Sequence, residues 1–231
     1  SAGAVAQESA KLEEVIVTAQ KREQNAMTVP ITVDTFSSRD IEVTGAQDIK
    51  GVEAYIPGFE AGDGVTQVGL TIRGVSSSNL SSGGDPSVAT FYDEDYVPQA
   101  ASTVTFSDMA RIEILKGPQG TLFGRNAAAG VVNMVPNQPG ADLEGFVSAR
   151  LGNYDLTRFE GMINAPLTDD LFMRANIYTN ERDGYIQNVS PGGDDVGAED
   201  NQAARIAFLW NITGATNLQV SYDYDKVDNA P

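Results

Sequence analysis

Apolar and polar residues alternate along five stretches of the chain after residue 146. In each stretch every second side chain is apolar or small, and the intervening ones are mostly polar or charged. Because successive side chains of a β-strand point to opposite faces of its sheet, the pattern predicts strands with one apolar and one polar face. The apolar series are Val147, Ala149 and Leu151; Phe159, Gly161, Ile163 and Ala165; Leu171, Met173, Ala175 and Ile177; Ala204, Ile206, Phe208, Trp210 and Ile212; and Leu218, Val220, Tyr222 and Tyr224.

This alternation is compatible with a soluble β-sandwich as well as with a membrane β-barrel. Three features favour the barrel. The strands run for about 9 to 12 residues, which is the length that a tilted strand needs to cross a bilayer. Trp210, Tyr222 and Tyr224 lie toward strand ends on the apolar face, and short turns alternate with the long acidic insertion 181–202. We therefore expect antiparallel strands of a transmembrane β-barrel in contact with outer-membrane lipid.

The chain before residue 140 has a different pattern. Ser38 can cap a short helix that continues to Val43, and helical spacing of apolar residues predicts a second helix over 46–56. Short apolar runs separated by polar loops predict strands that begin at Gly69, Val88, Arg111 and Val131. We therefore expect an α+β domain with a small mixed sheet, of roughly 120 residues, before the barrel strands.

Composition excludes several classes of function. The formal charge of −17, from 32 acidic and 15 basic residues, repels nucleic acid, so we expect no nucleic-acid partner. The chain has no Cys and no His, which makes thiol, zinc and haem chemistry improbable within it. No nucleophile and base pair stands out, so we expect no enzyme, no catalytic residues and no metal ligands.

The N-terminus carries a pattern typical of protein export. Ala4-Val5-Ala6 matches the small-x-small pattern at which signal peptides are cleaved, so residues 1–11 are expected to be a signal-peptide remnant or flexible N-terminus. An ordinary small-residue tail is the alternative. No run of 18 or more apolar residues occurs, which excludes a transmembrane helix within this sequence.

The glycine-rich stretch RIEILKGPQGTLFGRNAAAGVVNMV, residues 111–135, raises the question of nucleotide binding. A phosphate-binding loop of the Walker type needs GxxxxGK followed by Ser or Thr, and no such pair follows any of these glycines. The GxGxxG fingerprint of dinucleotide sites is absent as well. A nucleotide site is therefore not expected here.

The same stretch resembles the plug domain of TonB-dependent outer-membrane receptors, in which a similar segment is followed by Asn, small residues and a strand. The segments EEVIVTA, ITVDTFSSRDI, YIPGF and LTIRG resemble other marks of the family and occur in the expected order. The resemblance implies a Ton box at 12–20, a plug domain at 21–140 and the first five strands of a barrel, 22-stranded when complete, at 141–231. Since five strands cannot close a barrel, we expect the chain to be an N-terminal portion.

The resemblance also implies roles for particular residues. The Ton box is expected to be an exposed strand that binds TonB, and consists of Leu12, Glu13, Glu14, Val15, Ile16, Val17, Thr18 and Ala19; an ordinary structural edge strand is the alternative. Plug cations are expected to pair with carboxylates and lock the plug to the barrel wall, with wall partners expected beyond residue 231. A generic salt bridge is the alternative for each of them. The residues expected in this lock are Arg73, Lys116, Arg111, Glu113 and Arg125.

The plug loops are expected to face the ligand through Asn79, Asp85, Tyr96 and Gln99, although such loops often only connect elements. Asp93 and Glu94 replace a turn that carries glycine in relatives, which puts a tight type I′ hairpin in doubt. Asp93, Glu94 and Asp95 could instead hold a structural calcium ion, or form a solvated acidic turn.

The function that the resemblance implies is import across the outer membrane of Gram-negative cells, driven by TonB and its inner-membrane energising complex. The cargo is expected to be a small-molecule ligand, most often a ferric siderophore, whose iron belongs to the cargo and not to a resident cofactor. A glycan or another organic nutrient is the alternative cargo.

Overall fold

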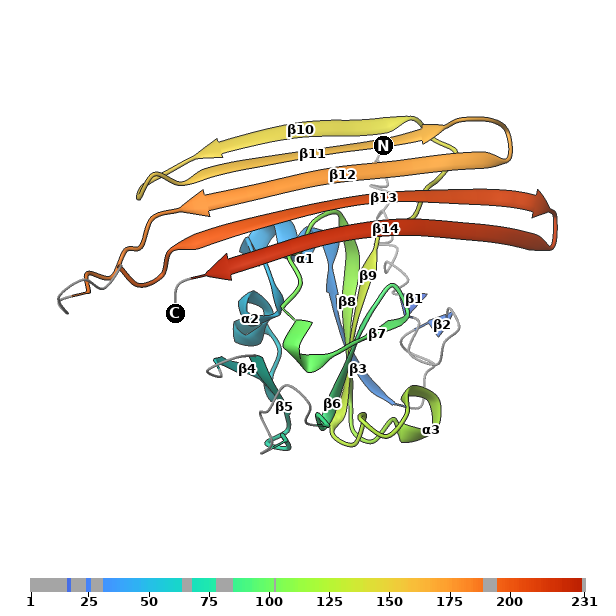
Figure 1. Cartoon of the computed structure of the whole chain (residues 1–231). Coiled ribbons are helices and arrows are strands. Elements are labelled where there is room, and N and C mark those ends of the chain that lie inside the picture. Colours follow the sequence, from blue (N-terminus) through green and yellow to red (C-terminus); the bar gives the residue numbers. More distant parts are fainter. Residues whose placement is uncertain are drawn as a thin grey trace, which may run out of the picture.

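The computed structural model describes residues 16–17, 24–25, 31–63, 68–77, 85–101, 103–188 and 195–229. Two five-stranded sheets and two small two-stranded sheets form the described part of the chain. Figure 1 shows the second five-stranded sheet lying across one side of the N-terminal domain. Within the described residues, no helix is long and apolar enough to cross a membrane.

The N-terminal domain is built on a mixed sheet in the order β3-β8-β9-β6-β7. In this sheet β6 and β9 are parallel, and the other neighbours are antiparallel. Its elements are β3 (Thr32–Ser37), α1 (Ser38–Thr44), α2 (Ile49–Val52), the 3-10 helix η1 (Glu53–Tyr55), β4 (Phe59–Asp63), β5 (Val68–Ile72), β6 (Val88–Tyr92), β7 (Asp95–Val97), the 3-10 helix η2 (Gln99–Ala101), β8 (Met109–Lys116), α3 (Gly120–Phe123) and β9 (Gly130–Pro136). Two further short strands, β1 (Ile16–Val17) and β2 (Gln24–Asn25), pair with each other.

Local sequence signals account for the first helix. The Ser37 hydroxyl accepts from the backbone N–H of Asp40, and the Asp40 carboxylate accepts from the Ser37 backbone, which is a capping box. The helix ends at Gly45, whose φ of 71° lies in the left-handed region that favours glycine. The predicted helix is therefore confirmed, but its cap is Ser37 and Ser38 is its first helical residue. The helix expected over 46–56 is shorter and consists of α2 followed by η1.

The core of the N-terminal domain lies between the mixed sheet and the elements α2, β4 and β5. Ile112 and Ile114 of β8, Met134 of β9, Ile49 of α2 and Ile72 of β5 are almost completely buried in it. Strands predicted from the short apolar runs are all present, with ends shifted by one or two residues. Burial of these apolar side chains is the main favourable contribution to the stability of the domain.

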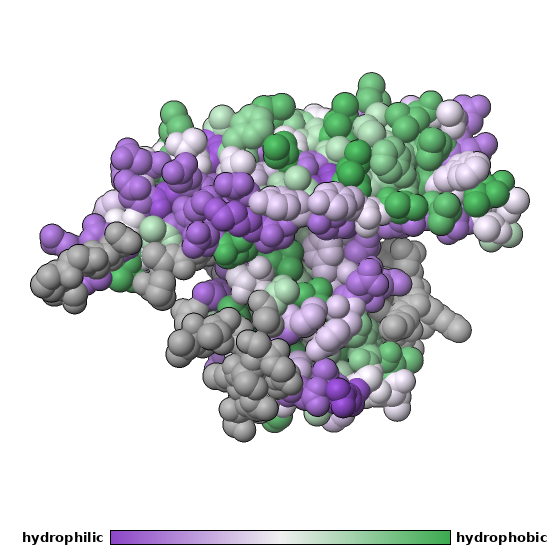
Figure 2. Space-filling view, in the orientation of Figure 1, coloured by the Kyte–Doolittle hydropathy of each residue, from purple (hydrophilic) through white to green (hydrophobic). Residues whose placement is uncertain are grey.

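The second five-stranded sheet, here called the wall sheet, is an antiparallel meander in sequence order. Its strands are β10 (Glu144–Leu151), β11 (Thr157–Pro166), β12 (Leu171–Arg182), β13 (Glu199–Thr213) and β14 (Thr216–Asn229). The predicted apolar series lies on the face turned away from the N-terminal domain, here called the outer face. Trp210, Ile206, Val220 and Tyr222 are exposed on it, and Figure 2 shows hydrophobic residues spread over the upper side of the sheet.

The opposite face of the wall sheet, here called the inner face, packs against the N-terminal domain. Asn164, Asn176, Asn180 and Arg205 are buried on it, in agreement with the predicted polar face. A soluble sandwich would bury the apolar face against a second sheet. Here the apolar face is the exposed one, as a membrane-spanning wall requires.

Candidate functional site

The polar contact between the N-terminal domain and the wall sheet has two centres. In the first, Asp108 of the N-terminal domain accepts two hydrogen bonds of 2.6 Å from Nε and Nη2 of Arg174 on β12. Asn137 donates to the Asp108 side chain at 2.9 Å and to its backbone carbonyl. The side chains of Arg174 and Asp108 are 11% and 6% exposed. A bidentate pair with this little solvent fixes both the distance and the orientation of its partners.

In the second centre, Arg205 of β13 is held between two carboxylates. Its Nη2 donates to Asp93 at 2.5 Å and its Nη1 to Asp223 of β14 at 2.7 Å. The Tyr92 hydroxyl donates to Asp223, and the Tyr92 ring lies 5.6 Å from the Arg205 guanidinium. Burial and the nearby Asp223 charge raise the pKa of Tyr92, so this hydroxyl remains protonated as a donor.

The turn between β6 and β7 presents Asp93 to the wall. Tyr92 and Asp95 are paired, and the two residues between them, Asp93 and Glu94, have φ of 49° and 70°. Positive φ at both central positions is the requirement of a type I′ turn. The doubt about a tight hairpin was therefore wrong, because the hairpin forms without glycine. Left-handed backbone in such residues costs about 1–2 kcal/mol each.

Calcium binding by Asp93, Glu94 and Asp95 stays a prediction, and the contacts of this turn in the structure are with protein groups. The Asp93 carboxylate is occupied by Arg205 and by the side-chain amides of Gln138 and Gln219. Glu94 and Asp95 are exposed. Among the described residues, no group of three acidic side chains is placed to hold a metal ion.

Further hydrogen bonds between the N-terminal domain and the wall surround the two centres. The Thr105 backbone donates to Asp225 at 3.0 Å, Asn176 donates to the Ser107 hydroxyl at 2.5 Å and Tyr178 donates to Gln47 at 3.3 Å. The start of the wall is fixed as well, because Asn164 on β11 both accepts from the Gly140 backbone and donates to its carbonyl. The domain is therefore attached to the inner face over three strands, β12, β13 and β14, and through its link to β10.

The residues predicted for the lock do not contact the described strands of the wall, and their pairing with wall residues beyond 231 stays a prediction. Arg111 pairs with Glu113 on the same strand at 2.7 Å, and Lys116 pairs with Asp34 and donates to the Pro57 carbonyl at 2.6 Å. All of these contacts are inside the N-terminal domain. Two further cations were predicted to join the lock. Arg125 pairs with Asp85 at 3.2 Å on an exposed surface, and Arg73 is exposed and makes no ion pair with another described residue.

In the ion pairs that the structure describes, the cations and anions lie on the opposite sides of the contact from those predicted. The cations, Arg174 and Arg205, belong to the wall, and the anions, Asp93 and Asp108, belong to the N-terminal domain. The sequence indicated where the two arginines would lie, because both fall on the predicted polar face of the wall strands. The aspartates carried no comparable signal, since their loops have no periodicity.

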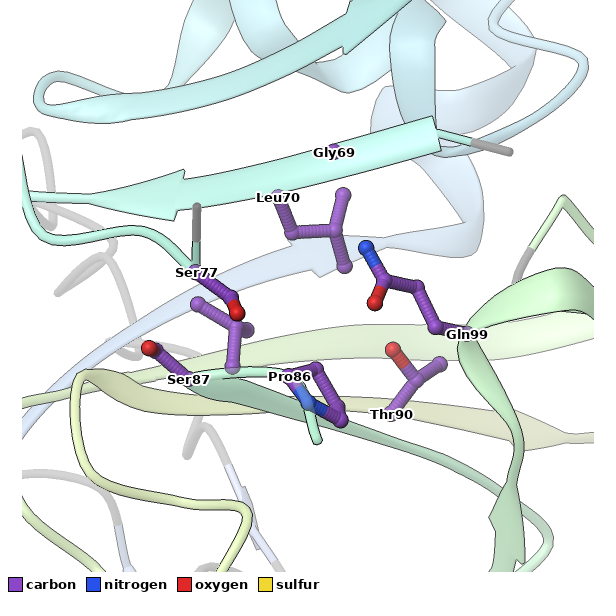
Figure 3. Close-up of a pocket in the computed structure, with 8 residues that line it drawn as sticks. Gly69, Leu70, Ser77, Pro86, Ser87, Thr90 and Gln99 are labelled. Carbon is purple, nitrogen blue, oxygen red and sulfur yellow. The ribbon is translucent and has the colours of Figure 1, made fainter. Parts of the chain in front are cut away.

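The residues predicted to face the ligand do not line one common site. Tyr96 accepts a hydrogen bond from Asn126 at 3.0 Å, Asp85 is paired with Arg125, and Asn79 lies outside the described residues. Gln99 borders a small pocket beside Leu70 and Thr90 (Figure 3). That pocket holds only about 10 Å³, which is the space of one water molecule.

The predicted Ton box is described at Ile16 and Val17 alone; Leu12–Val15, Thr18 and Ala19 lie outside the described residues. The side chain of Val17 is 0% exposed and packs in a cluster with Leu115, Val131 and Phe91. The expectation of an exposed strand is therefore wrong at Val17. The partner strand β2 supplies the backbone hydrogen bonds that a free strand would leave open.

A larger cavity separates α1 from the wall. It measures about 610 Å³ and is lined by residues of α1, of the loop before β8 and of strands β10, β11 and β12. This volume lies in the range typical of sites for small organic ligands. Polar and charged side chains of the wall, including Arg150, Arg158 and Glu160, face it.

An α+β domain that is tied by buried ion pairs to the polar face of a β-meander, whose other face is apolar and exposed, defines a plugged β-barrel of an outer membrane. Comparison with known proteins gives the family. Residues 25–131 match the family model described as the TonB-dependent receptor plug domain. The chain therefore belongs to the TonB-dependent outer-membrane receptors, and its N-terminal domain is the plug.

Relatives of known sequence are receptors and transporters. The chain is 28% identical to the pesticin receptor of Yersinia pestis over 198 residues, which cover 79% of this chain and 29% of the relative. It is 33% identical to the vitamin B12 transporter BtuB of Vibrio vulnificus over 136 residues, which cover 56% of this chain and 22% of the relative. The chain thus spans less than a third of the length of these relatives. None of them is named as an enzyme, in agreement with the prediction.

Solved structures give the same fold. The ferric yersiniabactin uptake receptor FyuA of Yersinia pestis superposes with a TM-score of 0.72 at 22% identity, over 80% of this chain and 29% of that one. The siderophore receptor PiuA of Acinetobacter baumannii superposes with a TM-score of 0.76 at 16% identity, over 95% of this chain and 29% of that one. The apolar outer face of the wall sheet accordingly lies against outer-membrane lipid.

Proposed function

We propose that the receptor imports a ferric siderophore across the outer membrane, with the plug as its gate and TonB as its source of energy. The names of the relatives support this cargo, since they include a ferric-pyoverdine receptor of Pseudomonas putida, 22% identical over 93% of this chain. Siderophore receptors also recur among the structural neighbours. The iron of such a cargo would be transported and not retained as a cofactor.

The main support for the proposal is the attachment of the plug to the inner face of the wall. A plug held by Arg174–Asp108 and Arg205–Asp93 obstructs the side of the bore that this wall lines. Passage of a bulky ligand therefore requires part of the plug to move or unfold. Such a motion costs free energy that a passive pore does not supply, which favours an energised importer over a porin.

Energy coupling is proposed to act through the Ton box, Leu12–Ala19. An extended segment can add a strand to the sheet edge of a partner, with backbone hydrogen bonds supplying affinity. For TonB to bind in this way, Val17 has to leave its buried site beside Leu115 and Val131. Binding of a peptide of residues 12–20 to the C-terminal domain of TonB would test this step; no binding at 100 μM peptide would contradict it.

Growth and uptake measurements test the cargo. A strain that lacks the receptor gene should grow more slowly under iron limitation with the cognate siderophore, and should lose uptake of the ⁵⁵Fe complex. Complementation with the intact receptor should restore both, and complementation without residues 12–20 should not. The proposal that the cargo is a ferric siderophore would be contradicted if ⁵⁵Fe uptake were unchanged in the deletion strain for every siderophore that supports growth of the host.

An organic nutrient is the second candidate cargo. The match to the vitamin B12 transporter supports this second cargo. Its sequence identity to this chain is higher than that of the pesticin receptor, although over fewer residues. A glycan belongs to the same class of cargo. Growth of the deletion strain on candidate nutrients with iron in excess separates this class from siderophores, because only a nutrient importer would be needed under those conditions.

A further inference from the structure

The two centres of the plug–wall contact are attached to different parts of the plug. Arg174 holds Asp108, which lies in the segment before β8. Arg205 holds Asp93, which lies in the turn of the hairpin β6–β7. This hairpin also takes part in the apolar cluster that buries Val17 of the Ton box. A change at the second centre can therefore reach the Ton box through a single pair of strands.

One face of the hairpin forms part of the site that buries Val17. Phe91 of β6 is 6% exposed and belongs to the same cluster as Val17. Tyr96 of β7 is paired directly with Phe91 in the ladder, and the two rings meet edge to face with their centroids 5.8 Å apart. Edge-to-face contacts of this kind stabilise aromatic pairs beyond the area that they bury. Tyr96 therefore supports Phe91 from the β7 side.

The next residues of the hairpin bind the wall. The Tyr92 hydroxyl donates to Asp223 at 3.2 Å, and the Asp93 carboxylate accepts from Arg205 at 2.5 Å. Since successive side chains of a strand point to opposite faces of its sheet, Tyr92 faces away from the cluster that holds Phe91. Three consecutive residues, 91–93, thus join the wall to the cluster around the Ton box.

The turn of the hairpin is strained, and the contacts of Asp93 hold it in place. Asp93 and Glu94 have φ of 49° and 70°, and glutamate tolerates left-handed backbone less well than aspartate does. The Asp93 carboxylate accepts from Arg205 and also from the side-chain amides of Gln138 and Gln219. Strained backbone persists only where its surroundings determine the conformation. Without the charged contact to Arg205, the turn can therefore relax into a different conformation.

Strand β7 is the element that such a relaxation would move. It has three residues, Asp95–Val97, and lies at the edge of the mixed sheet, where β6 is its neighbour among the described strands. Strand β6, in contrast, is paired with β9 as well as with β7. Short elements with few contacts open locally at a lower free energy than the core of a domain. Displacement of β7 would take Tyr96 away from Phe91 and loosen the cluster that buries Val17.

We infer that the hairpin β6–β7 is a latch for the Ton box, an element that keeps this segment buried until a contact with the wall is lost. While Arg205 holds Asp93, β7 stays in place and Val17 stays buried. Loss of that contact frees β7 first and the segment around residue 17 afterwards. Asp93 and Tyr96 are thus positioning residues for the Ton box. Use of the released segment by TonB rests on the proposed energy coupling.

Labelling of Ile16→Cys with a maleimide, in the intact receptor and without TonB, measures exposure of this segment, because residues 1–231 contain no native cysteine. Arg205→Gln should make labelling about tenfold faster, which corresponds to a loss of about 1.4 kcal/mol from the closed state. Tyr96→Ala removes the ring but leaves the contact of Asp93 with Arg205, and it should accelerate labelling as well. An unchanged rate in both variants would overturn the inference.

Relief of the strain should have the opposite effect. Glu94→Gly stabilises the closed turn, so it should slow labelling about fivefold, both alone and together with Arg205→Gln. The matched control is Arg174→Gln, which removes the wall arginine of the other centre and should leave the labelling rate within about twofold of the parent. If Arg174→Gln accelerated labelling as much as Arg205→Gln, a general loss of docking would explain the effect, and the latch would be disproved.

Labelling and peptide binding together distinguish failure of the latch from failure of the proposed function. Labelling that responds to Arg205→Gln and Glu94→Gly, in a receptor whose peptide of residues 12–20 does not bind TonB, supports the latch and contradicts the proposed energy coupling. Binding of the peptide to TonB, with labelling that responds to neither substitution, overturns the latch and leaves the proposed function intact.

Discussion

Asp108 of the plug and Arg174 of the wall, 66 residues apart in sequence, are joined by two hydrogen bonds of 2.6 Å each. Asp108 has a φ of 50°, as Asp93 has a φ of 49° in the second centre. Both plug aspartates that reach the wall are thus held in the left-handed region. Strain of this kind persists where surrounding contacts determine the conformation, and here the contact is a buried arginine.

The first prediction concerns this pair. Asp108→Asn keeps a residue that tolerates left-handed backbone but removes the charge, and should destabilise docking of the plug by about 3 kcal/mol, since it leaves Arg174 with only the more distant and exposed Glu144, at 3.7 Å, as a counter-ion. Hydrogen exchange of β8 and β9 in the intact receptor would measure the loss. The double variant Asp108→Asn with Arg174→Gln should recover part of the stability, and additive losses would contradict the pairing.

The second prediction concerns the turn between β6 and β7. Glu94→Gly should stabilise the plug by about 1 kcal/mol, because glycine adopts the φ of 70° without the cost that a side chain incurs there. Glu94 is exposed and forms no ion pair with a described residue, so little is lost. Denaturant midpoints would measure the gain. Glu60→Gly, within strand β4, is the control and should destabilise the plug.

The third prediction concerns the buried part of the Ton box. Val17→Ala removes two buried carbons and should weaken docking of β1 by about 1–2 kcal/mol. The chain has no cysteine, so a single Ile16→Cys substitution gives a clean probe of exposure. Maleimide labelling at residue 16 should become about tenfold faster with Val17→Ala. An unchanged labelling rate would mean that the Val17 contacts do not control exposure of this segment.

The fourth prediction concerns pH. Burial raises the pKa of Asp48, the N-cap of α2, although the backbone N–H groups of Gly51 and Lys50 lower it. The folded plug therefore holds this proton more tightly than the unfolded chain, and its contribution to stability falls as the pH rises from about 3.8 through the folded-state pKa. Asp48→Asn retains a capping oxygen and should stabilise the plug at pH 7 but not at pH 3.

Asp40 provides the control with the opposite sign. Hydrogen bonds from the side chain and backbone of Ser37 lower the pKa of Asp40, so its stabilising contribution is present above about pH 3.8 and is lost as the pH falls through the folded-state pKa. Asp40→Asn should therefore destabilise the plug at pH 7. Urea midpoints of both variants between pH 3 and 7 would check the two signs, and equal shifts would contradict the assignment.

Several features were predictable because they depend on neighbours that are close in sequence. The first helix was predictable from its serine start, although the cap is Ser37 and not Ser38, and the alternation along β10–β14 indicated the apolar and polar faces of the wall. The tight hairpin at Asp93 and Glu94 was doubted because the prediction considered only local backbone preferences. Local preference disfavours left-handed Glu, and the contact of the neighbouring Asp93 with Arg205, 112 residues away, outweighs that preference.

The sequence by itself determined the two structural regimes, the faces of each wall strand and the family, because periodicity and motif spacing are local properties of the chain. Only the tertiary structure decided that wall arginines meet plug aspartates, that Arg111 and Lys116 are used inside the plug, and that Val17 is buried. The physical reason is that an ion pair or a buried contact is specified by how two surfaces dock, and residues 66 to 112 positions apart become neighbours only after the plug has packed against the wall.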